Sequence, residues 1–162
     1  ETRVPGGEMT DGGHGGSGKH GGSGKHGPQA VELRVAARLE NLALLRTLVG
    51  AVGTFADLDL DSVADLRLAV DEACTLLIRS ASPGAALAVV VDPRDQDVVV
   101  EASVVCDTDD VVAPGSLSWM VMSSLTDEVQ IFHDGVQPGG ESDAAGRLFG
   151  ITLTTRRAGA SR

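Results

Sequence analysis

The chain has 162 residues, of which 42% are hydrophobic, and a formal net charge of −10 at pH 7. Length and composition suit one domain with a real core. From Val31 onward there are ten Arg, no Lys and twenty Asp plus Glu, so the folded part carries the whole charge and repels nucleic acid. No apolar run approaches the ~20 residues of a membrane helix and no signal peptide is visible, so we expect a cytoplasmic protein without membrane contacts.

The first 29 residues form a segment distinct from the rest. They are Gly-rich, carry the tandem repeat GGSGKHGGSGKH at 15–26 and lack the apolar pattern of a packed element. We predict a disordered tail at 1–29, one domain at 30–157 and a disordered end at 158–162. His14, His20 and His26 could bind a transition metal, but a flexible linker that happens to contain His is favoured, so no metal site is predicted.

The domain begins with a predicted strand and a predicted helix. Apolar and polar residues alternate over 31–37, which predicts a strand with one covered face. Residues 39–55 follow with apolar residues at helical spacing. The inner stripe of this helix is expected to consist of Leu42, Leu45, Val49 and Val52.

Residues 61–82 carry the strongest helix signal. Asp61 or Ser62 can cap its start, and Asp65 completes a capping-box pattern with Ser62. The Pro-Gly pair at 83–84 ends it. Its buried stripe is expected to consist of Leu66, Val70, Ala73 and Leu77.

The second half of the domain is mostly predicted strand. The segments are a Val-rich hairpin with strands at 87–91 and 98–105, a short helix at 116–125, and strands at 128–132 and 148–155. This order of elements, which is strand, helix, helix, hairpin, helix, strand and strand, predicts an α+β fold. We expect a two-layer sandwich in which helices cover one face of a mixed, mostly antiparallel sheet.

The acid pair Asp71 and Glu72 interrupts the apolar centre of the 61–82 helix. One interpretation is that Asp71 is solvated and Glu72 lies at the helix edge beside Arg79. The other interpretation is that Glu72 takes part in function, which the surrounding sequence favours.

The stretch LRLAVDEAC at 66–74, followed by two strands, resembles the signature helix of the serine-kinase anti-sigma factors. This family belongs to the histidine-kinase-like ATPase superfamily, and the resemblance covers residues 31–157. It implies that fold, ATP with magnesium as cofactors, a homodimer, an alternative sigma factor as binding partner and an anti-anti-sigma factor that releases it. It also implies that Glu72 is the general base, that Leu76 stands where an Asn ligates magnesium, and that Asp107 receives the adenine amino group.

The sequence departs from the family pattern at Leu76 and in the residues after Asp107, whereas Asp107 itself is retained. Leu76 has no oxygen to offer magnesium, which prefers oxygen ligands. After Asp107 the family's glycines are replaced by Thr-Asp-Asp-Val at 108–111, so close backbone approach is lost and two added carboxylates repel phosphate. An acidic, solvated turn at 107–110 is the alternative, and a second Gly-rich motif has no counterpart at 114–119.

Three functions therefore stay open. The favoured one is an anti-sigma factor that sequesters a sigma factor without needing ATP. The alternatives are an active serine-protein kinase that phosphorylates the anti-anti-sigma factor, and a nucleotide-binding sensor. The acidic surface supports the first because it attracts a basic partner, although acidity can also serve solubility alone.

The two cysteines, Cys74 and Cys106, are too few for a disulfide framework. We predict that both are small buried apolar groups. A redox role would require the helix and the sheet to bring them together.

Overall fold

The computed structural model describes residues 26–108, 110–134 and 146–159. Residues 1–25 of the predicted tail and residues 135–145 fall outside these ranges, whereas residues 26–29 are described. The elements in chain order are β1 (Val31–Ala36), the 3-10 turn η1 (Leu39–Asn41), α1 (Leu42–Phe55), α2 (Leu60–Ser80), β2 (Ala86–Pro93), β3 (Asp97–Cys106), α3 (Leu117–Leu125), β4 (Glu128–Asp134) and β5 (Arg147–Arg156).

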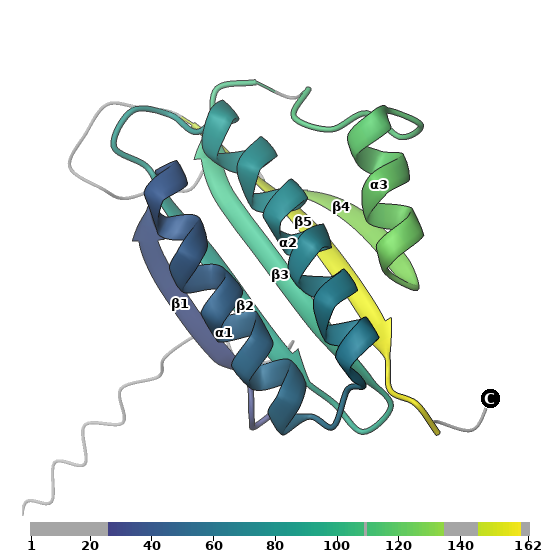
Figure 1. The fold of residues 1–162 in the computed structure, drawn as a ribbon. Helices are drawn as coiled ribbons and strands as arrows, with labels where there is room; N and C mark the ends of the chain where they lie inside the picture. The colour runs from purple at the N-terminus through teal and green to yellow at the C-terminus, as the bar shows by residue number, and fades with distance from the viewer. Residues whose placement is uncertain (1–25, 109, 135–145, 160–162) are drawn as a thin grey trace, which may run out of the picture.

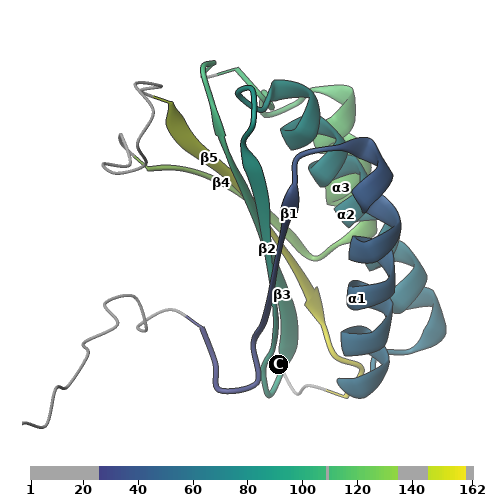
Figure 2. The same cartoon turned by 90° about the vertical axis from the view of Figure 1, so that its left-hand side faces the viewer.

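The five strands form one sheet in the order β1-β2-β3-β5-β4. All four pairings between described strands are antiparallel, so the mostly antiparallel prediction is confirmed and these strands include no parallel pair. The three α-helices cover a single face of the sheet (Figure 2). In Figure 1, α2 lies between α1 and α3. The predicted α+β, two-layer sandwich of the histidine-kinase-like ATPase type is therefore the fold of this chain.

The core lies between the sheet and the helices. The predicted stripe of α2 is entirely buried, and in the α1 stripe only Leu42 is partly exposed. On β3, every second residue from Val98 to Cys106 is buried, as expected for a strand with one face toward helices. This alternation is what fixes which sheet face the helices cover.

The start of α2 differs from the prediction. The N-cap is Asp59, whose Oδ1 accepts a hydrogen bond from the backbone N–H of Ser62 at 2.8 Å and whose Oδ2 accepts from its hydroxyl at 2.8 Å. The bonds from Ser62 lower the pKa of Asp59. Neither Asp61 nor Ser62 is the cap, because the cap lies two to three residues earlier, at Asp59, and Ser62 serves as the donor.

The sheet face turned away from the helices is polar where β3, β4 and β5 meet. A cavity of about 410 Å³ there is lined mainly by polar side chains, among them Glu101, Gln130 and Thr152. Near it, Gly150 of β5 leaves room for the ring of Phe132 on β4, which any Cβ at residue 150 would strike. No helix in the described ranges is long and apolar enough to cross a membrane.

Candidate functional site

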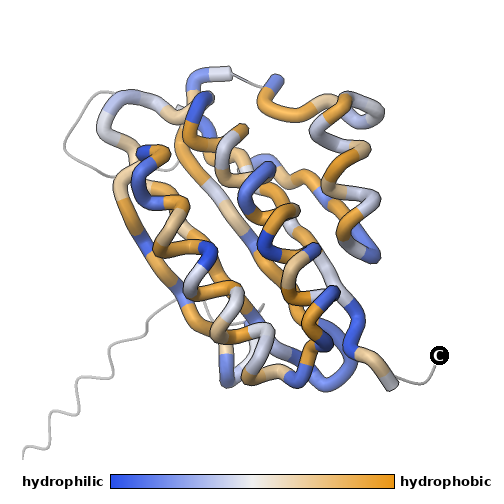
Figure 3. Tube along the Cα trace, in the orientation of Figure 1, coloured by the Kyte–Doolittle hydropathy of each residue, from blue (hydrophilic) through white to orange (hydrophobic). Residues whose placement is uncertain are grey.

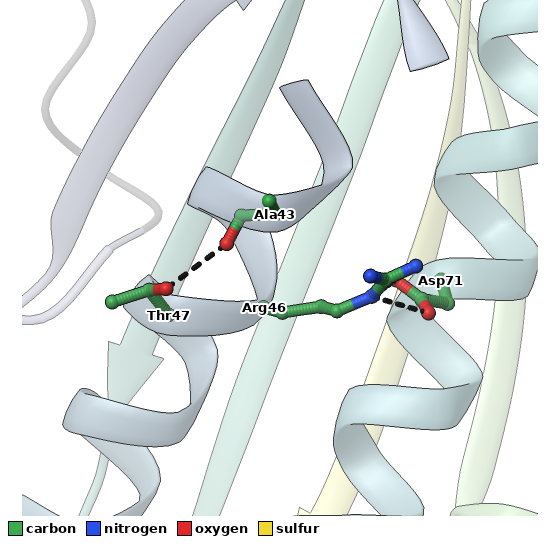
Figure 4. A network of polar contacts seen from close by, with 4 residues as sticks. All are labelled: Ala43, Arg46, Thr47 and Asp71. Carbon is green, nitrogen blue, oxygen red and sulfur yellow. Dashed lines mark hydrogen bonds and ion pairs between the residues drawn. The ribbon is translucent and has the colours of Figure 1, made fainter. Parts of the chain in front are cut away.

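The adjacent acids at the centre of α2 contact different neighbours. Asp71 accepts from Nε of Arg46 on α1 at 2.8 Å and 2.7 Å, through Oδ1 and Oδ2 (Figure 4). Glu72 accepts at Oε1 from the hydroxyl of Ser118 on α3, at 2.5 Å. Because consecutive helical residues point about 100° apart, one pair of residues connects α2 to both flanking helices. The alternative interpretation, a solvated Asp71 with Glu72 beside Arg79, is therefore not what these contacts show.

The ion pair between Arg46 and Asp71 is open to solvent on the Arg side. The side chain of Arg46 is 44% exposed and that of Asp71 is 25% exposed. Such a pair contributes at most about 1 kcal/mol to stability. Its structural effect is to hold the Asp71 carboxylate toward α1.

Ser118 occupies an inward position of α3. The helix is capped by Ser116, whose hydroxyl accepts from the backbone N–H of Trp119 at 3.3 Å. Ser118 shares one face with the buried Met122 and with Leu125, which packs against the core. A hydroxyl at such a position needs a hydrogen-bond partner, and Glu72 supplies it.

Ser118 is not among the site residues predicted from the sequence. The available signal was a Ser at an inward position of a helix that has no charged residue. Its partner could not be inferred, because Ser118 and Glu72 are 46 residues apart in the chain.

Leu76 and Asp107 lie toward the same end of the sandwich. Leu76 is one turn after Glu72 on α2, is partly buried and packs against the core. Asp107 is exposed and directly follows β3. An isolated bridge between Ala81 and Cys106 joins the end of α2 to the end of β3.

The described residues at this end do not fit ATP with magnesium. The aliphatic side chain of Leu76 offers no oxygen to the metal. Beyond Asp107 the chain is held down by Val111 and Val112, both buried in the core, rather than presenting glycine backbone to a ligand. The Glu72 carboxylate already accepts a hydrogen bond from the hydroxyl of Ser118.

Both cysteines are buried and unbonded to each other, as predicted. Burial, with a smaller effect from the Asp71 charge, raises the pKa of Cys74 to about 12. The Cys106 thiol lies 3.3 Å from the carbonyl oxygen of Thr108 and 3.7 Å from that of Arg147. Both thiols therefore have the surroundings of structural rather than reactive cysteines.

The strand order and the helix layer, with Glu72 at the centre of the second α-helix, are those of an ATPase-like sandwich. Two curated relatives are similar to this chain. The chain is 72% identical over 134 residues to "Anti-sigma-F factor RsbW" of Mycobacterium tuberculosis strain CDC 1551 / Oshkosh, which covers 83% of this chain and 77% of the relative. The same values hold for the protein of that name in strain ATCC 25618 / H37Rv.

The chain belongs to the RsbW-type anti-sigma factor family, because identity at this level extends over most of both chains. The resemblance drawn from residues 66–74 is thereby confirmed. No family model matches the chain.

The bond between Glu72 and Ser118 is expected to stabilise the fold. Ser118→Ala should lower the free energy of unfolding by about 1–2 kcal/mol, since it leaves a partly buried carboxylate without its donor. Glu72→Ala should cost a similar amount, and the double variant should cost less than the sum. Urea unfolding of the four proteins measures this coupling, and Glu72→Gln, which keeps an acceptor oxygen, is the control. Strict additivity would contradict a direct bond.

The buried thiols are expected to resist alkylation. In the Cys106→Ala variant, Cys74 should react slowly with iodoacetamide at pH 8 in the native state, because its raised pKa leaves almost no thiolate. After unfolding in urea it should react at the rate of a free cysteine. Mass spectrometry follows both rates, and rapid native labelling would show that the site opens.

Proposed function

We propose that this chain sequesters an alternative sigma factor by binding it, and that an anti-anti-sigma partner releases the complex. The observation that supports the proposal is the 72% identity to relatives named as anti-sigma-F factors. We also propose that the chain forms a homodimer in the cytoplasm. We further propose that the chain consists of a disordered tail at 1–29, one domain at 30–157 and a disordered end at 158–162.

The charge of the domain supports this kind of partner. From Val31 onward the acids outnumber the bases by twenty to ten. A protein that binds promoter DNA presents basic surfaces, and opposite charge steers such a partner toward this chain. Because charge alone also serves solubility, the family relation rather than the charge carries the proposal.

ATP with magnesium is the cofactor pair that the family resemblance implies, and the described residues argue against it. Phosphoryl transfer depends on holding phosphates and magnesium in line with the attacking hydroxyl. A general base alone achieves little, and here Leu76 lacks the metal-binding oxygen while Glu72 is engaged by Ser118. Sequestration by binding needs neither component, so we favour it over the kinase.

Sigma factor binding should persist without nucleotide and weaken as salt rises. The reason is that attraction between an acidic surface and a basic partner is screened by ions. Titration of purified sigma factor by isothermal calorimetry, at 50 mM and 500 mM NaCl without ATP, measures both effects. Glu72→Gln, which keeps an acceptor oxygen for Ser118, should leave the affinity close to that of the wild type. If sigma factor binds only when ATP is present, the proposal of binding without nucleotide is wrong. If the affinity is the same at both salt concentrations, the proposed electrostatic contribution is wrong.

Kinase activity should be very weak or absent. The chain is incubated with ATP, magnesium and the anti-anti-sigma partner, and phosphoserine is measured by mass spectrometry. Leu76→Asn should improve magnesium-dependent nucleotide binding, because it restores an oxygen ligand. Near-complete phosphorylation at catalytic amounts of the wild type, lost in Glu72→Ala, would instead establish the kinase.

A further inference from the structure

Helix α3 has an apolar surface turned to solvent. Its inner face carries Met122, which is fully buried, whereas Leu117, Met120 and Val121 are 77%, 61% and 36% exposed. These three residues have the spacing i, i+3 and i+4, so they share one side of the helix. None of the nine residues of α3 is charged.

This surface continues toward α2. The two helices run antiparallel in Figure 1, and the bond from Ser118 to Glu72 fixes how they lie against each other. The turn of α3 after Ser118 therefore lies alongside the turn of α2 before Glu72, which carries Leu68, 56% exposed. Leu68, Leu117, Met120 and Val121 make up what we call the α3 surface.

Acidic residues flank the α3 surface along the chain. Residues 107–134 contain six Asp or Glu and no Lys or Arg. Asp107 and Asp110 are exposed before α3, and Asp127 and Glu128 are exposed after it. In Figure 3 the orange and white tube of α3 has blue segments on either side. An apolar centre with a charged rim is the usual anatomy of a protein-binding surface.

We propose that the α3 surface binds an amphipathic helix whose apolar side chains are flanked by Lys or Arg. This inference rests on the proposed function, because the sigma factor is the protein that supplies the helix. The apolar residues of the incoming helix cover the α3 surface, and its basic residues meet the acids before and after α3.

The same charges disfavour other occupants. A second copy of this chain, docked through the same surface, would place its exposed Asp107, Asp110, Asp127 and Glu128 near the same four acids of the first copy. Nucleic acid and anionic lipid carry the same sign of charge as the rim and are repelled in the same way. A basic protein helix satisfies both the apolar centre and the acidic rim.

Leu117→Asp tests the surface, and Leu60→Asp is its matched control. Each Leu is the first residue of its helix, Leu117 in α3 and Leu60 in α2, and they are 77% and 86% exposed. An acid in the first turn of a helix is favourable, so neither change should disturb folding. The two variants differ in whether the residue belongs to the α3 surface.

Binding to purified sigma factor should weaken at least tenfold in Leu117→Asp, since a carboxylate would enter an apolar contact. Leu60→Asp should stay within twofold of the wild type. Met120→Gln, which keeps the side-chain length without adding charge, should also weaken binding. Asp110→Asn should make the affinity less sensitive to salt. Thermal unfolding confirms that each variant is folded.

The outcomes separate this inference from the proposed function. If the wild type binds and both Leu117→Asp and Met120→Gln bind equally well, the α3 surface is wrong while sequestration stands. If Leu60→Asp weakens binding as much as Leu117→Asp, the start of α2 is part of the contact and the assignment to α3 is overturned. If the wild type does not bind the sigma factor, the proposed function fails and this inference fails with it.

Discussion

The arrangement of the helix layer depends on two consecutive carboxylates. Asp71 and Glu72 leave α2 in directions about 100° apart, so one bonds to Arg46 on α1 and the other to Ser118 on α3. Apolar packing holds the helices to the sheet and restricts how they lie beside one another. The two polar contacts add defined partners to that packing.

The bond from Ser118 gives Glu72 a structural role that is independent of catalysis. The hydrogen bond from the Ser118 hydroxyl to the Glu72 carboxylate stabilises the contact of α2 with α3 and does not depend on a nucleotide. Leu76, Val111 and Val112 belong to or pack against the core, in segments where the family pattern has a magnesium-binding Asn and glycines. Each change adds packed apolar surface, so the residues that disfavour a nucleotide favour the folded state.

Local sequence patterns predicted most of the fold. The features that were not predicted, the α2 cap and the contact of Ser118, depend on the three-dimensional structure. The stripes of α1 and α2 and the Val-rich strands follow from periodicity, which a single segment contains. The α2 cap was placed two to three residues late, because several acids in DLDLD offer a cap and the sequence does not distinguish Asp59. Glu72 and Leu76 were recognised from one helix, whereas Ser118 is 46 residues away from its partner. No short-range pattern encodes that separation.

The acidic residues near α3 and the exposed apolar side chains of α3 together explain how binding alone could keep a partner from binding DNA. Phosphate contacts by Lys and Arg dominate the affinity of proteins for DNA. An acidic rim such as that around α3 attracts the same side chains, so a basic helix bound there has fewer charges left for DNA. The apolar residues of α3 add a contribution that DNA backbone cannot match, since it offers no comparable apolar surface. Competition of this kind needs no phosphoryl transfer, which agrees with a fold whose central carboxylate is committed to holding α3 in place.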